Sequence, residues 1–207
     1  MSDEKSLEGA YALETKDDVT RLYADWAESY DASFADSHGY VAPRNLAAIF
    51  EAERDGPGPV LDIGAGTGLV AEHLSGEVDG LDLSPEMLRI AAEKRLYRNR
   101  IVGDLTAELP IETGSYAGLI SAGTFTHGHV GPVCLPELMR IARPGALFCL
   151  SINAEVFDKS GFGSAFAALV ADGTVAPMRF QHLPFYAPDQ THDHANDHGL
   201  VAIFNRI

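Results

Sequence analysis

Cysteine and positive charge are both scarce in this sequence of 207 residues. Its two cysteines, Cys134 and Cys149, form no Cys-x-x-Cys pair, so we expect neither a disulfide framework nor a structural zinc site. Thirty acidic residues against fifteen basic ones give a formal net charge of −15. Nucleic-acid-binding proteins usually carry a basic patch that neutralises phosphates, so this balance favours a small molecule or a protein as substrate and predicts no nucleic-acid partner.

Long apolar runs are missing as well. No run approaches the ~20 residues that a membrane-spanning helix needs, and the polar start at residues 1–5 lacks the apolar core of a secretory signal. We therefore expect a cytoplasmic protein with no membrane partner. The hydrophobic content of 46% is enough for one sizeable α/β domain, on the usual prior of roughly 100–200 residues per domain.

The sequence does contain a glycine-rich stretch at residues 60–69, which reads Val-Leu-Asp-Ile-Gly-Ala-Gly-Thr-Gly-Leu. Its apolar start predicts a short strand, and the spacing of residues 69–74 predicts a helix after the turn. Gly64, Gly66 and Gly68 permit positive φ and lack the Cβ atoms that would hold a ligand away from the backbone. A nucleotide-like ligand can therefore lie against the turn.

The spacing of these glycines bears on which nucleotide binds. A dinucleotide fingerprint, Gly-x-Gly-x-x-Gly, would need its third glycine where Leu69 stands, whereas that glycine comes one residue early, at Gly68. The strand also carries an acid, Asp62, just before the turn. A carboxylate there favours a ligand that bears an ammonium or a sulfonium over one that presents only anionic groups.

Residues 60–68 resemble the first motif of the class I S-adenosylmethionine-dependent methyltransferases. The resemblance implies a doubly wound, Rossmann-like α/β fold in which a seven-stranded, mostly parallel sheet has the order 3-2-1-4-5-7-6. It also implies S-adenosyl-L-methionine as the cofactor and S-adenosyl-L-homocysteine as its product. The resemblance extends over residues 20–207, with its specific motifs between Asp62 and Gly145.

Three acids, Asp62, Asp82 and Asp104, fall at the ends of successive predicted strands. Ligands bind at the carboxyl ends of the strands in open α/β sheets, so matching places favour a binding site over three unrelated loop acids. Asp82 follows Gly64 by close to the ~20 residues at which an acid accepts hydrogen bonds from ribose hydroxyls in such sheets. By resemblance, Asp104 would accept a hydrogen bond from the adenine amino group.

The resemblance also assigns neighbours of these acids to the cofactor. Leu83 and Met87 would touch the ribose or the adenine, although a core position is the alternative for Met87. Leu105 would pack on the adenine ring and donate its backbone N–H. Ser121 and Ala122, at the exit of the fourth strand, would contact the methionine part.

An aromatic stripe precedes the glycine-rich core. Leu22, Trp26 and Tyr30 recur at helical spacing. They predict a helix over residues 21–31 with one aromatic face, and Tyr23 lies beside it. Such a face either packs on the core or forms a lid over the cofactor, since π faces attract a sulfonium as they attract an ammonium. The pattern Tyr-x-x-Trp-Ala-x-x-Tyr-Asp resembles the small-molecule branch of the family, especially the Williams-Beuren-region methyltransferase-like proteins.

The acceptor is expected beside residues 124–129. The strand exit at residues 121–124 departs from the Asn/Asp-Pro-Pro-Tyr/Phe motif of amino-methylating relatives, which argues against a DNA-adenine or glutamine N-methyltransferase. Without a Pro-Cys pair there is no candidate nucleophile for attack on cytosine C5. His127 and His129 are candidate general bases, because an ordinary histidine pKa of ~6.5 suits that work, and loop or subunit contacts are the alternative.

Four further histidines lie near the C-terminus, where the neighbouring sequence is polar and rich in turn-forming residues. No helical His-x-x-x-His pairing with a nearby acid fixes a coordination geometry, so we predict a solvated loop and no metal. These residues are His182, His192, His194 and His198.

The remaining pattern predicts the other elements of the fold. Helices are predicted at residues 40–53, at 136–141, at 162–170 and after Ser84, which would be an N-cap. Strands are predicted at residues 77–83, 100–105, 116–124, 146–152, 178–183 and 200–206, with a turn at 143–145.

We expect residues 1–55 to form an N-terminal helical lid contiguous with a cofactor-binding core at residues 56–207. The predicted cofactor-binding residues are Tyr23, Trp26, Tyr30, Asp62, Gly64, Ala65, Gly66, Thr67, Gly68, Asp82, Leu83, Met87, Asp104, Leu105, Ser121 and Ala122. The expected reaction is direct, in-line transfer of a methyl group to a nucleophile of a small-molecule acceptor. We expect the protein to be a monomer or a homodimer.

Two alternatives to this enzyme stay open. A non-catalytic module that binds the cofactor as a sensor, or that stabilises a partner subunit, would share every cofactor residue. A nicotinamide-dependent oxidoreductase shares the fold logic but needs the later glycine and a Tyr-x-x-x-Lys or similar catalytic pair, which the sequence lacks.

Overall fold

The computed structural model describes residues 21–22 and 26–207, and its centre is a seven-stranded sheet of order β3-β2-β1-β4-β5-β7-β6. The strands from β3 to β5 are parallel, whereas β7 pairs antiparallel with both β5 and β6. The predicted fold class and strand order are therefore confirmed. The strands are β1 (Val60–Ile63), β2 (Val78–Asp82), β3 (Arg100–Val102), β4 (Tyr116–Phe125), β5 (Ala142–Asn153), β6 (Arg179–Pro184) and β7 (His198–Asn205).

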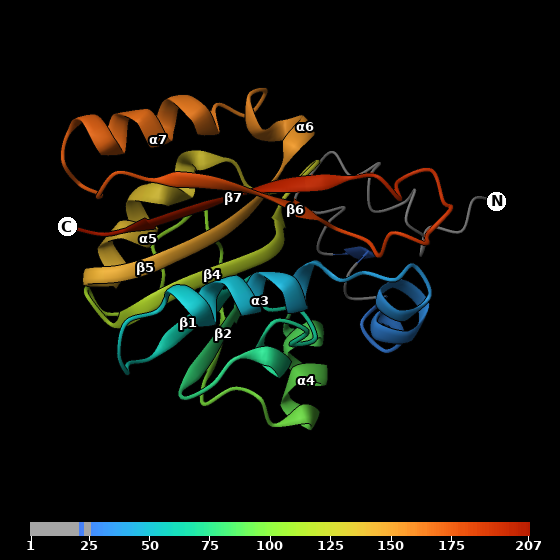
Figure 1. Cartoon of the computed structure of the whole chain (residues 1–207). Helices are drawn as coiled ribbons and strands as arrows, with labels where there is room; N and C mark the ends of the chain where they lie inside the picture. Colours follow the sequence, from blue (N-terminus) through green and yellow to red (C-terminus); the bar gives the residue numbers. More distant parts are fainter. Residues whose placement is uncertain (1–20, 23–25) are drawn as a thin grey trace.

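Helices cover both faces of this sheet, with α3 and α4 on one side and α5, α6 and α7 on the other (Figure 1). Phe162 and Phe166 of α7 pack on β5 and β7, and Leu46 and Phe50 of α3 fill the opposite face. Both faces of the central strands are thus buried, as parallel sheets require. The helical elements are η1 (Asp31–Asp36), α3 (Ala42–Glu53), η2 (Ala71–His73), α4 (Pro85–Lys94), η3 (Pro132–Cys134), α5 (Leu135–Ile141), α6 (Ala154–Phe157) and α7 (Phe162–Ala171).

The N-terminal aromatic segment departs from the continuous helix predicted at residues 21–31. Residues 27–29 form a turn, in which the Ser29 N–H donates to the Trp26 carbonyl at 3.0 Å, and the π-helical turn η1 follows. Leu22 and Trp26 are buried in the cluster that contains α3. The stripe therefore does pack on the core, while Tyr23 lies outside the described residues.

The helix in the connection between β1 and β2 is shorter than predicted. Only η2, a single 3-10 turn, forms where a helix was expected at residues 69–74, and Leu74 already has extended backbone. The chain leaves the glycine turn at Gly68 and must enter β2 at Val78. The glycine turn takes residues 64–68 of this connection, so only residues 69–77 are left for a helix and for the loop that enters β2.

The start of β5 also differs from the sequence prediction. Residues 143–145, predicted as a turn, lie inside the strand, and the register jumps from Tyr116 opposite Ala142 to Gly118 opposite Leu147. Gly145 takes a φ of +83°. The Arg-Pro-Gly segment is thus a bulge that extends the strand instead of ending it.

The N-terminal region packs closely on the core. A Cβ placed on Gly118 of β4 would lie 2.4 Å from Cζ of Phe50, so this glycine lets α3 lie directly on the sheet. The boundary expected between residues 55 and 56 stays a prediction. Among the described helices, none is long and apolar enough to span a membrane.

Candidate functional site

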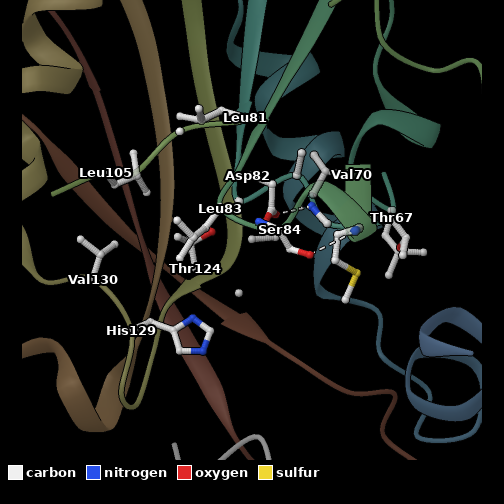
Figure 2. A pocket seen from close by; sticks show the side chains of 18 of the residues that line it. Thr67, Val70, Leu81, Asp82, Leu83, Ser84, Leu105, Thr124, His129 and Val130 are labelled. Carbon is white, nitrogen blue, oxygen red and sulfur yellow. Dashed lines mark hydrogen bonds between the residues drawn. The ribbon is translucent and has the colours of Figure 1, made fainter. Parts of the chain in front are cut away.

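A cavity of about 340 Å³ opens where β1, β2, β3 and β4 end (Figure 2). Its walls are the glycine turn after β1, residues 81–84, residues 103–106 and the exit of β4 at residues 122–124. The wall is completed by the loop at residues 128–130 and by Tyr30, Tyr40, Pro43, Leu69, Val70 and Met87. The volume lies at the lower end of the ~300–1,000 Å³ that small-molecule and cofactor sites occupy.

The glycine turn needs two of its glycines for different reasons. Gly64 has a φ of +66°, and a Cβ on it would lie 2.0 Å from Oγ1 of Thr124, whose hydroxyl donates to the Ile63 carbonyl at 2.9 Å. β4 therefore crosses the turn at a distance that only glycine allows. Gly66 has a φ of +53° and no neighbour within 4 Å of an added Cβ, so its open side faces the space for a ligand.

Asp82, at the end of β2, braces the turn from the opposite wall. Its Oδ2 accepts a hydrogen bond from the Gly66 N–H at 2.7 Å, and its Oδ1 accepts one from the Ser84 N–H at 2.8 Å (Figure 2). Burial raises the pKa of Asp82, and these backbone donors act against that rise. Since an ionised carboxylate has about four acceptor positions, it can accept further bonds from ligand hydroxyls.

Asp62 lies beneath the cavity and is not part of its wall. The Tyr97 hydroxyl donates to Oδ2 of Asp62 at 2.7 Å, and Oδ1 has no hydrogen-bond partner among the described residues. Burial raises the pKa of Asp62 to about 7, and the nearby charge of Asp82 adds to the rise. A cation bound above the turn would favour the ionised form of this carboxylate.

Asp104, just after β3, belongs to the wall of the cavity together with Leu105. Its Oδ1 accepts hydrogen bonds from the N–H of Thr106 at 2.9 Å and from the Thr106 hydroxyl at 2.8 Å. This local turn fixes the position of the carboxylate in the cavity wall.

Tyr30 and Trp26, both predicted to cover the cofactor, occupy different layers. Tyr30 lines the cavity, whereas Trp26 is only 1% exposed and packs edge-on against the Tyr30 ring at 5.2 Å and 82°. The Trp26 indole N–H also donates to Oγ of Ser33 at 2.8 Å. Trp26 therefore supports Tyr30 from behind, and of the two only Tyr30 lines the cavity.

The two candidate bases, His127 and His129, lie in different surroundings. His129 lines the cavity, and burial together with the neighbouring His127 lowers its pKa to about 4. His127 points away, with Nε2 at 3.3 Å from Oε2 of Glu155 in α6. Of the two, only His129 lines the cavity, and its lowered pKa keeps the imidazole neutral at physiological pH.

Tyr40 is a wall residue that the sequence did not single out. A Cβ on Gly123 would lie 3.0 Å from the Tyr40 hydroxyl oxygen, so the phenol reaches the exit of β4. Tyr40 also pairs with Tyr186 in an isolated β-bridge. The only signal in the sequence was its place at the start of the helix predicted at residues 40–53, which does not distinguish a wall residue from a core one.

The cavity thus brings together most of the predicted site. The predicted residues that line it are Tyr30, Gly64, Ala65, Gly66, Thr67, Asp82, Leu83, Met87, Asp104, Leu105, Ala122 and His129. The described ones that do not are Trp26, Asp62, Gly68, Ser121 and His127. Ser121 is fully buried and donates its hydroxyl to the Ile63 carbonyl at 2.8 Å, so it supports the turn from below.

Within the described part of the chain, no group of three or more metal-ligating side chains is close enough to hold a metal ion. The rings of His182 and His198 lie 4.3 Å apart, and Nδ1 of His194 is 3.0 Å from Oδ2 of Asp197. The first contact joins β6 to β7, and the second lies within the loop at residues 185–197. The loop predicted for all four histidines therefore contains only His192 and His194.

Comparison with known families identifies the domain that holds this cavity. Residues 61–150 match the family described as a methyltransferase domain. The chain carries a class I S-adenosylmethionine-dependent methyltransferase domain. The match runs from β1 into β5 and contains the glycine turn, Asp82 and Asp104. The predicted family is confirmed, and the expected cofactor, S-adenosyl-L-methionine, is the cofactor of that family.

Two kinds of curated relative match parts of this chain. Human methyltransferase-like protein 27 is 34% identical over 138 residues, which cover 63% of this chain and 56% of that protein. The 18S rRNA (guanine-N(7))-methyltransferase of Bos taurus is 40% identical over 70 residues, 32% of this chain and 25% of that protein. The chain therefore spans little more than half the length of the first relative and a quarter of the second.

Solved methyltransferases share the fold. A TehB-like enzyme of Corynebacterium glutamicum superposes with a TM-score of 0.58 at 20% identity, covering 91% of this chain and 98% of that one. A phosphoethanolamine N-methyltransferase of Haemonchus contortus, solved with S-adenosylhomocysteine, gives a TM-score of 0.62 at 16% identity and covers 91% and 58%. At these identities the likeness shows the fold alone.

One expectation from composition is overturned. The acidic balance favoured a small molecule or a protein as substrate and predicted no nucleic-acid partner, yet several relatives of this methyltransferase domain are named for the modification of 18S rRNA. Net charge describes the average field of a protein and does not identify the molecule that reaches one cavity. The exclusion of nucleic acid was therefore wrong.

Proposed function

We propose that this chain transfers a methyl group from S-adenosyl-L-methionine directly to a nucleophile that enters the cavity beside Tyr40 and His129. One observation carries the proposal: a single cavity joins the glycine turn, the carboxylates of Asp82 and Asp104, and the exit of β4. Backbone N–H groups and two acids at the strand ends suit an adenosyl group, and the opposite wall leaves room for an acceptor.

The chain's own residues divide the work of binding. Asp82 would accept hydrogen bonds from the ribose hydroxyls while it keeps the turn in place through Gly66. Asp104 would hold the adenine amino group, with Leu105 and Met87 against the ring. S-adenosyl-L-methionine, when bound, supplies a methyl group on a sulfonium that is already activated for displacement. Tyr30 would cover that end, since an aromatic face attracts a cation.

The acceptor side offers uncharged groups. Among the described wall residues there is no lysine or arginine, and the two charged ones are the acids of the cofactor side. An anionic group would find no counter-charge there, so the reacting part of the acceptor is expected to be uncharged. A nucleobase turned out of RNA satisfies this condition, because its phosphates stay outside the pocket.

Positioning accounts for most of the expected rate. Holding a nucleophile in line with an activated methyl group removes much of the entropic barrier. His129 would accept a proton or a hydrogen bond from the nucleophile, as its lowered pKa keeps the ring neutral. A nucleophile without a proton would need only the orientation.

A labelling experiment tests the proposal. The purified chain is incubated with methyl-tritiated S-adenosyl-L-methionine in three separate reactions. One contains the RNA fraction of its source cells, one the protein fraction and one the metabolite fraction. The proposal predicts label in one fraction, reduced by about tenfold or more in Asp82→Ala, because hydrogen bonds to charged groups contribute ~1.5–3 kcal/mol. Asp193→Asn is the control, because this acid is exposed and lies off the cavity wall.

Label in no fraction, with cofactor binding intact, would contradict methyl transfer and favour the sensor alternative. Absence of cofactor binding would contradict both. Label in the RNA fraction would place the chain with its rRNA-modifying relatives in function as well as in sequence.

A further inference from the structure

Asp31 joins the N-terminal segment to the cofactor site. We define residues 26–36, which contain Trp26, Tyr30 and η1, as the cover segment. The Thr67 hydroxyl donates to Oδ1 of Asp31 at 2.5 Å, although the two residues are far apart in sequence. Thr67 is only 1% exposed and belongs to the cavity wall through the glycine turn (Figure 2). The cover segment is therefore attached to the turn that would hold the cofactor.

A lysine completes this attachment. Nζ of Lys94, at the end of α4, lies 2.6 Å from Oδ2 of Asp31 and 2.6 Å from Oε1 of Glu72 in η2. The two carboxylates raise the pKa of Lys94 against the effect of its burial. The cover segment, the connection after β1 and α4 thus meet at one charged group.

A second ion pair also joins the cover segment to α4, but its carboxylate has no hydrogen bond from the glycine turn. Glu28 of the cover segment pairs with Arg89 of α4, and their side chains are 75% and 51% exposed. Exposed pairs of this kind contribute little, because water screens them. Asp31, at 32% exposed, combines an ion pair with a hydrogen bond from a buried hydroxyl. The two acids therefore form a natural comparison.

The position of Asp31 sets the position of Tyr30, the next residue toward the N-terminus. Tyr30 lines the cavity, and Trp26 packs edge-on behind it. Fixing the Asp31 carboxylate on Thr67 and Lys94 therefore places the Tyr30 ring over the cavity.

We propose that Asp31 is a positioning residue that closes the cover segment over the cofactor and couples this closure to the glycine turn through Thr67. The inference rests on the proposed function, since it assumes an adenosyl ligand on the turn. Coupling between two sites is reciprocal. A ligand that orders the turn must favour the closed cover segment, and loss of the Asp31 contacts must weaken the ligand.

The chain carries its own reporter for this closure. Trp26 is the single tryptophan of the sequence and lies in the cover segment, so intrinsic tryptophan emission comes from this segment alone. Its indole is buried against Tyr30 and Ser33 in the closed arrangement. Opening would expose the indole to water and shift its emission to longer wavelength.

The test compares Asp31→Ala and Asp31→Asn with Glu28→Gln in the full-length protein. Each is titrated with S-adenosyl-L-homocysteine by calorimetry and by Trp26 fluorescence, after circular dichroism has shown that it folds. Asp31→Ala is expected to raise the dissociation constant roughly tenfold and to shift the emission of the free protein to longer wavelength. Glu28→Gln is expected to stay within about twofold of wild type in both measurements.

A double-mutant cycle separates coupling from general loss of stability. Thr67→Val and Asp31→Ala should each weaken ligand binding, and together by clearly less than the product of their effects, because both remove the hydrogen bond from Thr67 to Asp31. Independent, multiplying effects, or a wild-type dissociation constant and emission in Asp31→Ala, would overturn the inference. If Asp31→Ala does not fold, Asp31→Asn and Lys94→Gln carry the same expectations. Failure of the wild-type protein to bind the ligand would instead overturn the proposed function.

Discussion

The cavity has a cofactor half and an acceptor half, which are made of different kinds of chemical group. The cofactor half consists of backbone N–H groups, glycines and the carboxylates of Asp82 and Asp104, all at the ends of parallel strands. The acceptor half consists of the side chains of Tyr40, His129 and Val130, which come from loops far apart in the sequence. The sheet topology dictates the first half, whereas the second depends on how separate loops pack. Changes in one half should therefore affect different properties from changes in the other.

The largest effect on stability is expected from Gly64→Ala, because Gly64 lies where the two halves of the cavity meet. The new Cβ would lie 2.0 Å from Oγ1 of Thr124 at a φ of +66°. We expect a loss of about 2 kcal/mol or more in the free energy of unfolding, from strain and overpacking together. Thermal unfolding measures it, and Gly64→Ala with Thr124→Ala should recover the part due to the clash. No recovery in the double variant would contradict this packing.

Gly66→Ala should affect binding far more than stability. Its added Cβ meets no protein atom within 4 Å, so only the φ of +53° costs stability, about 1 kcal/mol. The methyl group would occupy the space against which the cofactor lies, and we expect affinity for S-adenosyl-L-homocysteine to fall by about a hundredfold. Calorimetry and thermal unfolding on the same variant check the contrast. Unchanged affinity would place the ligand elsewhere.

Asp62 should make stability depend on pH. Burial raises its pKa from 3.8 to about 7, so between these values the folded protein keeps a proton that the unfolded chain releases. This group therefore lowers stability as pH rises through that window, by an amount on the order of 2–4 kcal/mol, and has no further effect above it. Urea unfolding from pH 4 to 8 should show a flatter profile for Asp62→Asn.

The control for that profile is Asp193→Asn, at an exposed position in the last loop. It should follow the wild-type curve. A wild-type profile in Asp62→Asn would show that the buried carboxyl is not the group that titrates.

The smallest effect on the cofactor is expected from the acceptor half. Tyr40→Phe and His129→Gln remove only polar groups of the opposite wall, so affinity for S-adenosyl-L-homocysteine should change by less than about twofold. Methyl transfer to the labelled fraction should fall in His129→Gln by about a hundredfold if the nucleophile carries a proton, as expected for loss of a general base. A large loss of cofactor affinity in either variant would contradict the division of the cavity.

The same division explains which parts of the site could be predicted from the sequence. Gly64, Asp82 and Asp104 were recognisable because each depends on local rules, namely strand ends, turn glycines and the spacing between them. Tyr40 was not recognisable from the sequence, because its contact with Gly123 depends on how the segment before α3 packs against the exit of β4. Composition gave no guide to the acceptor.

Several local predictions failed for physical reasons of the same kind. The helix expected at residues 69–74 is only the single turn η2, because the glycine turn takes up the first part of the connection to β2. Trp26 was correctly placed on an aromatic face, but which aromatic would reach the cavity depended on a turn at residues 27–29 that periodicity does not show. The strand order followed from the family resemblance and not from periodicity.

The central claim is that the cavity at the strand ends holds an adenosyl cofactor through Asp82. Calorimetric titration of the wild-type protein and Asp82→Ala with S-adenosyl-L-methionine and S-adenosyl-L-homocysteine tests it most directly, with NAD and NADP as controls. We predict one site for the adenosyl compounds alone, with affinity about tenfold or more weaker in Asp82→Ala. Binding of NAD instead, or adenosyl binding that Asp82→Ala leaves unchanged, would contradict the account.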